Sequence, residues 1–359
     1  METQLEMKNG NGMSKKPERK AAHVVQPVER LTKKFGISAT FGIDLGPELD
    51  DNDNPILDAF GKPVMKEREV TGFVEPGPET PQIDPHYVFP DEDTKMILLG
   101  LELRDRILLT GMTGTGKTSI LEQIAARLNY NVIKINFDGA ITRQDLIGEW
   151  VVKPGTQGSG SIMEFQYGIL PHAFQMPGTI IILDEWDTIS GECSFVLQRP
   201  LQKDDGKLLI LENGGELIPL HPQNTIIATA NTCGMGDDTG LHTQGTKVQN
   251  YAQLNRFSMT VKMQYLKAED EVKMIQKRFP DLKSMECEVF VKAINLIREA
   301  YVSGQISAPL SSRDLINWVE KFVLLGDPMR AATYCFLNRM PAEDAETAYS
   351  TLQRNFKDS

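Results

Sequence analysis

The stretch Gly111-Met112-Thr113-Gly114-Thr115-Gly116-Lys117-Thr118 decides which fold this chain can adopt. Its spacing is G-x-x-x-x-G-K-T; it follows an apolar, strand-like run at 107–110 and opens a helical pattern at 118–128. Glycines let backbone N–H groups converge on a phosphate chain, Lys117 supplies a point charge, and Thr118 supplies a hydroxyl for Mg²⁺. This setting predicts a phosphate-binding loop for a nucleoside triphosphate and disfavours a chance glycine-rich turn. The predicted nucleotide-binding residues are Gly111, Thr113, Gly114, Thr115, Gly116, Lys117, Thr118 and Ser119.

A second motif adds two carboxylates. The apolar run 179–183 ends in Asp184 and Glu185. In an open α/β sheet, ligands bind at the carboxyl edge of the strands, which is where we expect both acids. Asp184 can hold Mg²⁺ together with Thr118, and Glu185 can orient or deprotonate an attacking water. The alternative, two acids that only cap the next helix, has little weight downstream of a phosphate loop. We therefore expect ATP and Mg²⁺ as ligands, with Thr118 and Asp184 on the metal.

Composition argues against several classes of protein. The chain has 359 residues and 40% hydrophobic content, enough for more than one folding unit. Its 38 basic and 49 acidic residues give a net charge of −11, which argues against a general nucleic-acid-coating surface. The cysteines are scattered without C-x-x-C spacing, so we expect reduced thiols rather than disulfides or a zinc site. No signal peptide or long apolar span is evident, which predicts a cytoplasmic protein without membrane insertion.

Changes in composition and periodicity predict four segments. Residues 1–34 form a flexible basic tail, either a docking arm or a solubilising extension, and residues 35–92 form an acidic Pro/Gly-rich segment and linker that can bury little. Residues 93–266 alternate strands and helices as an α/β nucleotide-binding domain with a parallel sheet, and residues 267–359 form a helical lid domain. Further strands are expected at 131–137, 179–183, 225–230 and 258–265, and lid helices at 268–278, 287–301, 312–325 and 330–339.

Two insertions with hairpin character interrupt the α/β domain. Residues 151–165 carry a glycine-rich tip between β-like flanks. The turn sequence Asn213-Gly214-Gly215 separates apolar runs at 207–212 and 216–220, a strong hairpin signal. In a ring-forming nucleotide hydrolase such loops would point toward the pore, and ordinary surface hairpins are the alternative.

Polar residues outside the two motifs complete the candidate site. Asn231 ends the strand after the acids, where it can position water and sense the nucleotide, or be a simple turn residue. Arg256 precedes the last strand and can face a neighbouring subunit's site as an arginine finger, or form a surface ion pair. Arg313 opens a lid helix and can reach the phosphates, or be an exposed helix arginine. Arg199 is a weaker interface candidate. The candidate catalytic residues are Glu185, Asn231, Arg256 and Arg313.

The strings around these motifs are more specific than the motifs themselves. They are Phe41-Gly-Ile-Asp44, Ile83-Asp-Pro-His-Tyr-Val-Phe89, Leu121-Glu-Gln-Ile-Ala-Ala-Arg-Leu128, Arg143-Gln-Asp-Leu-Ile-Gly148, Gly168-Ile-Leu-Pro171, Asp184-Glu-Trp-Asp187, Ala228-Thr-Ala-Asn-Thr232, Gly236-Asp-Asp-Thr-Gly-Leu241, Asn255-Arg256-Phe257 and Ser312-Arg313. Their order resembles the AAA+ ATPases of the MoxR class and, within that class, the ATPase subunits of aerobic cobaltochelatase, the CobS family. The resemblance spans residues 41–354.

The resemblance implies a homo-oligomeric, hexameric ring with nucleotide sites between subunits. It implies two hairpin insertions, a sensor at Asn231, an arginine finger at Arg256 and a second sensor at Arg313. It also implies a partner protein with a von Willebrand A-type domain and a larger client, which in cobaltochelatase inserts Co²⁺ into a corrin ring. The sequence departs from the family in its basic tail, in the acidic stretch between Phe41 and Ile83, and in Trp186, which stands where a tyrosine is usual.

Three functions remain open at this point. The first is a ring-forming ATPase that remodels a partner protein complex. The second is a nucleic-acid translocase, which the acidic net charge and the two glutamates flanking the hairpin turn, Glu212 and Glu216, disfavour. The third is a nucleotide-dependent scaffold whose hydrolysis is incidental. The intact acid at Glu185 makes the scaffold the weakest of the three.

Overall fold

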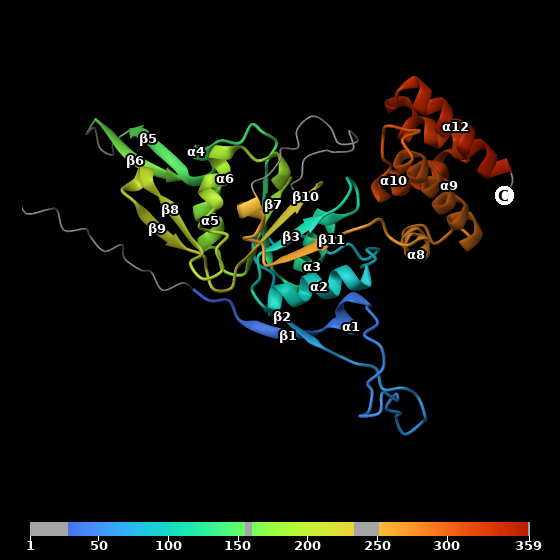
Figure 1. Cartoon of the computed structure of the whole chain (residues 1–359), viewed down its shortest axis with the longest axis horizontal. Coiled ribbons are helices and arrows are strands. Elements are labelled where there is room, and N and C mark those ends of the chain that lie inside the picture. Colours follow the sequence, from blue (N-terminus) through green and yellow to red (C-terminus); the bar gives the residue numbers. More distant parts are fainter. Residues whose placement is uncertain (1–27, 155–159, 233–250, 358–359) are drawn as a thin grey trace, which may run out of the picture.

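The computed structural model describes residues 28–154, 160–232 and 251–357. A five-stranded parallel sheet in the order β11-β3-β10-β7-β4 forms the centre of the molecule (Figure 1). The strands are β3 (Ile107–Thr110), β4 (Asn131–Asn136), β7 (Thr179–Asp184), β10 (Thr225–Ala230) and β11 (Met259–Lys262). Since β3, β10 and β7 are adjacent and parallel, their carboxyl ends meet at one edge. The predicted α/β fold class is confirmed.

The last strand is shorter than the predicted 258–265. Its partner β3 ends at Thr110, where the glycine-rich loop begins. The N–H of Met263 still donates to the carbonyl of Thr110 at 2.7 Å, and the chain then runs on toward the helical domain. The strand therefore ends where its pairing partner ends.

Alternate side chains of the central strands serve two separate cores. On β7, Ile181 and Leu183 enter one core, whereas Ile180 and Ile182 enter the other. All four side chains are fully buried, which is why the strand reads as a continuous apolar run. The first core is covered by α4 (Arg143–Ile147), α5 (Ile169–Gln175) and α6 (Gly191–Leu197), and the second by α2 (Asp91–Glu102) and α3 (Lys117–Leu128).

Both expected hairpins are present at the end of the sheet away from the helical domain (Figure 1). One pairs β5 (Gly148–Pro154) with β6 (Ser161–Tyr167), and the other pairs β8 (Lys207–Ile210) with β9 (Glu216–Pro219). The predicted glycine-rich tip at 155–159 lies outside the described residues. Trp150 donates to the carbonyl of Glu212 at 2.9 Å, so the two hairpins are joined to each other.

The segment before the nucleotide domain buries more than its composition predicted. Strand β1 (Thr32–Gly36) pairs with β2 (Glu69–Phe73), and the short helix α1 (Ile37–Phe41) follows β1. Val70 and Phe73 are each 1% exposed, and Phe73 packs edge-on against Tyr130 with ring centroids 4.7 Å apart. The expectation of little burial is therefore wrong for this part. Of the predicted basic tail, residues 1–27 lie outside the described residues.

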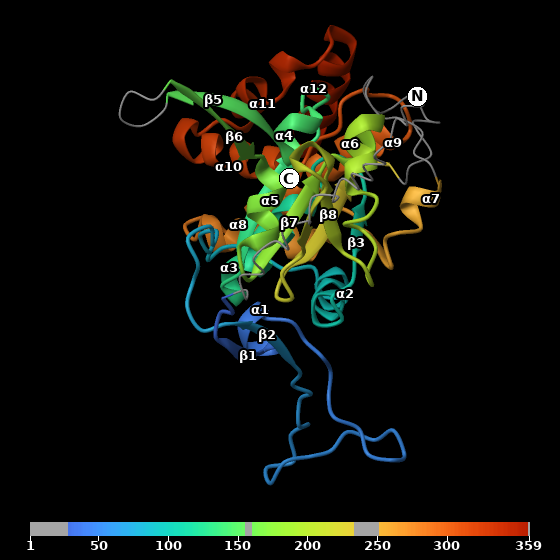
Figure 2. The same ribbon diagram turned by 90° about the vertical axis from the view of Figure 1, so that its left-hand side faces the viewer.

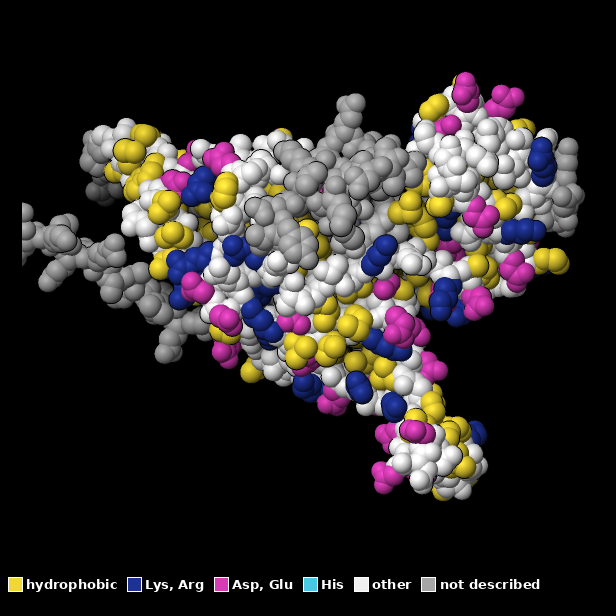
Figure 3. Space-filling model, in the orientation of Figure 1, with side chains coloured by type: hydrophobic (Ala, Val, Ile, Leu, Met, Phe, Trp, Pro, Cys, Tyr) yellow, Lys and Arg dark blue, Asp and Glu magenta, His cyan; other side chains and the backbone are white. Residues whose placement is uncertain are grey.

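Residues 46–66 form an arm that projects away from the body of the molecule (Figure 2). The arm repeats the pattern L-D-x-x-x-x-P at Leu49 and at Leu57. In each copy an aspartate, Asp50 or Asp58, accepts hydrogen bonds from the backbone N–H groups two and four residues further on. Hydrophobic and acidic side chains share its surface (Figure 3), and Phe60 is 88% exposed.

The helical domain has its own hydrophobic core and lies beside the nucleotide domain (Figure 1). Its elements are α8 (Ala268–Arg278), α9 (Ser284–Val302), α10 (Ser312–Leu325), α11 (Pro328–Cys335), the short 3₁₀ helix η4 (Leu337–Arg339) and α12 (Ala342–Lys357). The helix expected at 330–339 ends early, because α11 breaks at Phe336 before η4. Helix α12 was not predicted. Within the described ranges, no helix has the length and apolarity to span a membrane.

Candidate active site

The loop between β3 and α3 is the centre of the candidate site. Gly114 and Gly116 have φ angles of 81° and 86°, which favour glycine. A Cβ at Gly111 would lie 2.3 Å from the carbonyl oxygen of Met263, and one at Gly114 would lie 2.2 Å from Cβ of Ser311. Gly111 and Gly114 are thus required by neighbouring backbone and side chains as well as by phosphate access, and Gly116 by its φ angle. Thr115 donates to the carbonyl of Met112 at 2.9 Å, and Ser119 lies half-buried on the first turn of α3.

Lys117 is held over the loop by three hydrogen bonds. Its Nζ donates to the carbonyls of Gly111 at 2.7 Å and Met112 at 3.0 Å, and to Oδ1 of Asn231 at 2.9 Å. Only 8% of the residue is exposed. Burial lowers the pKa of Lys117 to about 8, and the nearby carboxylates of Asp187, Asp184 and Glu185 only partly offset this. Within the described residues, the hydrogen-bond partners of this ammonium are two backbone carbonyls and one amide oxygen, all uncharged, so its positive charge can attract phosphate oxygens.

Two oxygens suited to a hard cation meet beside the loop. The hydroxyl of Thr118 donates to Oδ1 of Asp184 at 2.9 Å, across the gap between α3 and the end of β7. Thr229 of β10 donates to the same carboxylate oxygen. Mg²⁺ is usually bound by one or two protein oxygens, with water and phosphate oxygens completing its shell. Thr118 and Asp184 fit such an ion.

Glu185 has an unusual backbone conformation. Its φ of 57° and ψ of 45° are left-handed, which is uncommon for a residue with a side chain and is concentrated at functional sites. Its N–H donates to the hydroxyl of Thr229 at 3.3 Å. Burial raises the pKa of Glu185, and the negative charges of Asp184, Asp187 and Asp138 raise it further, against the opposing effect of Lys117. A carboxylate with a raised pKa is a better proton acceptor, as a base for water requires.

Asp187 is a structural support of the site that sequence reasoning missed as an individual residue. It is 1% exposed, and its Oδ2 accepts from the N–H groups of Asn231 and Thr232, each at 3.0 Å, and from the hydroxyl of Thr232 at 3.2 Å. These bonds fix the turn that presents Asn231 to Lys117. The signal was available, because Asp187 ends the string Asp184-Glu-Trp-Asp187. Thr229 was also missed as an individual residue, although it stands in the string Ala228-Thr-Ala-Asn-Thr232, because a threonine within an apolar strand gives no sign of its role.

Trp186, between these acids, is a core residue. It is 1% exposed and packs edge-on against Phe257 and Phe137, with ring centroids 5.6 and 6.1 Å away. Phe257 follows Arg256 directly. The packing of Trp186 thus connects the end of β7 to the segment that carries Arg256.

The helical domain, which the sequence predicts to be a lid, contacts the loop through the start of α10. Ser311, the N-cap of α10, accepts a hydrogen bond from the N–H of Asp314 in a capping box. The close approach of Ser311 to Gly114 puts this end of α10 against the phosphate loop. Arg313 lies on the first turn of α10 and is exposed, and within the described residues it makes no hydrogen bond or ion pair.

The structure does not bring Arg256 or Arg199 into contact with the loop. Nη1 of Arg256 donates to the carbonyl of Gln198, just after α6, at 2.7 Å. Arg199 is occupied by an ion pair with Asp205, at 2.8 Å. Of the predicted site residues, the loop, Asp184, Glu185 and Asn231 therefore form one cluster, and Arg256 lies outside it. The matched string at 236–241 falls outside the described residues.

Comparison with known proteins gives the class first. The AAA domain family of the dynein-related subfamily matches residues 106–243, the part that carries the loop, both acids and Asn231. The protein is an AAA+ ATPase. The aerobic cobaltochelatase subunit CobS of a Sinorhizobium species is 34% identical over 314 residues, which cover 86% of this chain and 92% of CobS. The chain belongs to the CobS family, which confirms the resemblance drawn from its motifs.

Two more distant likenesses accompany this match. Midasin of Dictyostelium discoideum is 28% identical over 284 residues, which cover 76% of this chain and 4% of midasin. The RuvB Holliday junction branch migration motor of Thermotoga maritima superposes with a TM-score of 0.45 at 12% identity, covering 71% of this chain and 72% of RuvB. A superposition at this level says nothing about function.

Proposed function

We propose that this ATPase works in the cytoplasm as a ring, of six subunits by analogy with its class, and that Mg-dependent ATP hydrolysis in the ring remodels a partner protein complex. Lys117 and the backbone N–H groups of the loop bind the phosphates, and Thr118 and Asp184 hold Mg²⁺. The bound ion would offset phosphate charge during hydrolysis. Glu185 orients the attacking water and accepts its proton, and Asn231 positions that water against the phosphates.

The observation that supports a ring is the position of the Arg256 side chain. Transfer of a phosphoryl group builds up negative charge that an arginine commonly stabilises. Within the described residues, the side chain of Arg256 hydrogen-bonds to the carbonyl of Gln198, beyond α6, and makes no hydrogen bond to the phosphate loop of its own subunit. An arginine that serves the reaction from this position would reach the site of a neighbouring subunit. Such head-to-tail contacts close into a ring when the rotation between subunits permits.

The proposed partners rest on family membership. CobS is named as a subunit of aerobic cobaltochelatase, and the present chain spans nearly the whole of it. We therefore propose a complex with a protein that carries a von Willebrand A-type domain and with a larger client, a chelatase subunit in the CobS case. The joined hairpins β5–β6 and β8–β9 are the elements proposed to move that client.

Mixing two inactive variants tests the ring. Arg256→Ala lacks the proposed finger but keeps its own site, and Glu185→Gln lacks the base but can still donate Arg256. Each variant alone should be nearly inactive while still binding ATP. Random mixing at equal amounts should restore about a quarter of the wild-type rate, because half of the sites have Glu185 and half of those have an intact neighbour. Turnover per subunit should also rise with protein concentration, in step with particle mass.

Two results would change the proposal. Mixtures that remain inactive, with turnover independent of concentration in a stable monomer, would exclude shared sites and favour a nucleotide-dependent scaffold. ATP turnover stimulated by DNA and lost on adding salt would favour a nucleic-acid translocase. At the second hairpin, Arg143 forms an ion pair with Glu212 at 2.7 Å. This pair counts against the translocase, because it neutralises a cation near the turn that could otherwise contact a nucleic-acid phosphate.

A further inference from the structure

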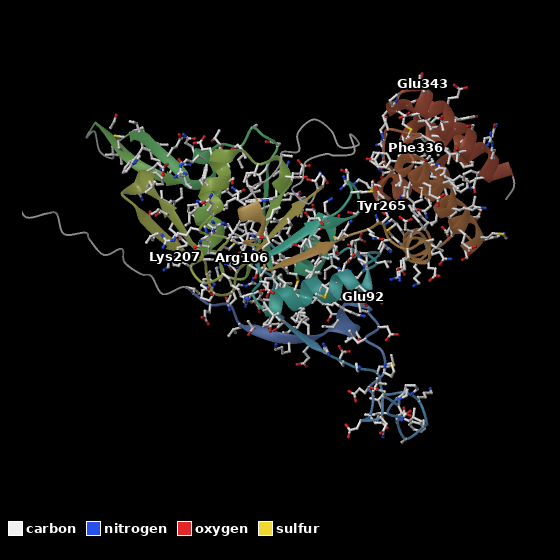
Figure 4. All side chains as sticks on the ribbon, viewed as in Figure 1. Glu92, Arg106, Lys207, Tyr265, Phe336 and Glu343 are labelled. Carbon is white, nitrogen blue, oxygen red and sulfur yellow. The ribbon has the colours of Figure 1, made fainter. Side chains whose placement is uncertain are left out.

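Two adjacent residues of the phosphate loop contact the lid domain by separate routes. The carbonyl of Thr113 accepts a hydrogen bond from the hydroxyl of Tyr265 at 3.0 Å. Gly114 lies so close to Ser311 that a Cβ on it would be 2.2 Å from Cβ of that serine. Tyr265 belongs to the segment that joins β11 to α8, between the sheet and the lid (Figure 4). The loop is therefore hydrogen-bonded to the connection and lies against Ser311, the N-cap of α10.

The two routes meet at a buried ion pair inside the lid. The guanidinium of Arg298, on α9, lies over the ring of Tyr265, 4.2 Å from its centroid. The same group donates to both carboxylate oxygens of Glu271, on α8, at 2.8 and 2.9 Å, and to the carbonyl of Leu310 at 2.9 Å. Glu271 also accepts from the hydroxyl of Ser312 at 2.9 Å. Since Ser312 follows Ser311, the contacts form a closed circuit that begins and ends on the loop.

This circuit has little freedom to rearrange. The side chains of Arg298 and Glu271 are 6% and 0% exposed, so neither charge can turn to water if the other moves. A planar guanidinium held by a bidentate carboxylate and a carbonyl has one orientation, which fixes the surface on which Tyr265 stacks. Burial raises the pKa of Tyr265, so its hydroxyl remains a neutral donor to Thr113 at physiological pH.

We propose that Tyr265, Arg298 and Glu271 are positioning residues of the ATPase, which make the N-terminus of α10 follow the conformation of the phosphate loop. Phosphates that bind the loop N–H groups move Thr113 and Gly114. Tyr265 and the ion pair transmit this movement to Ser311 and Ser312, and so place Arg313 one residue further on. The inference rests on the ATPase activity of the chain and not on the proposed ring or client.

Tyr265→Phe is the sharpest test, because it removes one hydroxyl and keeps the ring beneath Arg298. We expect kcat for ATP to fall about fivefold, the effect of one ordinary hydrogen bond, with KM changed less than about twofold. We also expect nucleotide to protect the amides of 312–315 from hydrogen exchange in the wild type but not in the variant, while amides of 117–120 remain protected in both. Tyr334→Phe, on the exposed face of α11, is the matched control and should behave as wild type.

A double-mutant cycle separates the circuit from a general loss of stability. Ser312→Ala removes the other end of the chain of contacts and should lower kcat in the same direction. Because both changes open one circuit, the double variant should lose no more than the stronger single one. Additive losses, an unchanged kcat in Tyr265→Phe, or a fall in kcat that only follows a lower melting temperature with α10 protection intact would each overturn the proposal.

Discussion

Lys117→Met is expected to change how the stability of the nucleotide-free protein depends on pH. Burial lowers the pKa of Lys117 from its ordinary 10.5 to about 8, so the folded state releases this proton earlier than the unfolded state. Below pH 8 both states are protonated, and the buried charge destabilises the fold. Between about pH 8 and 10.5 only the unfolded state keeps the proton, so the stability of the wild type rises with pH relative to the variant.

The size of the effect follows from the two pKa values. Linkage gives the wild type a relative gain of about 2.5 kcal/mol in the free energy of unfolding between pH 7 and pH 10. Methionine fills a similar volume and carries no proton, so the variant should lack this gain. Lys117→Met also loses the hydrogen bonds that Nζ makes to Gly111, Met112 and Asn231. This loss lowers the free energy of unfolding of the variant by a similar amount at each pH, so it changes the pH dependence little.

Urea unfolding at pH 7, 8.5 and 10, followed by tryptophan fluorescence without nucleotide, measures this difference. Lys321→Met, at an exposed lysine on α10, is the matched control and should follow the wild type. If the wild type and Lys117→Met change in parallel from pH 7 to pH 10, within about 0.5 kcal/mol, Lys117 is not desolvated and the argument from its burial is refuted.

Three further predictions concern the neighbouring side chains. Asp187→Ala should lower the free energy of unfolding by about 2–4 kcal/mol in urea titrations, because it leaves the amides of Asn231 and Thr232 without an acceptor; Asp187→Asn should cost less than half as much, and equal losses would contradict this. Glu185→Gln should bind ATP within about threefold of wild type in titrations and turn it over at least about 100-fold more slowly, whereas a milder loss would exclude Glu185 as the base. Trp186→Ala should destabilise the nucleotide domain by about 3–5 kcal/mol in thermal unfolding, since it empties the space between Phe137 and Phe257, and a change below about 1 kcal/mol would contradict that packing.

Most secondary structure could be predicted where a single periodic pattern applies. The helices at 268–278 and 312–325 were predicted to the residue, because amphipathic spacing and clear end signals coincide there. The burial of Val70 and Phe73 was not predicted. The prediction relied on the acidic, proline-rich composition of the whole segment, which is true of the 46–66 arm but not of the short strand that follows it. Helix α12 was missed because the polar run at its start gives no strong apolar signal.

By itself, the sequence determined the local chemistry of this protein. The spacing of Gly111, Gly116 and Lys117 specifies a phosphate loop, and Asp184-Glu185 after an apolar run specifies the acids at a strand end, because both motifs act through neighbouring residues. Only the tertiary structure decided which distant groups meet. Strand order places Oδ1 of Asn231 2.9 Å from Nζ of Lys117. Folding of the helical domain brings Arg298 and Glu271 against Tyr265, whose hydroxyl contacts the loop. Such contacts depend on how strands and helices pack, and no spacing along the chain encodes them.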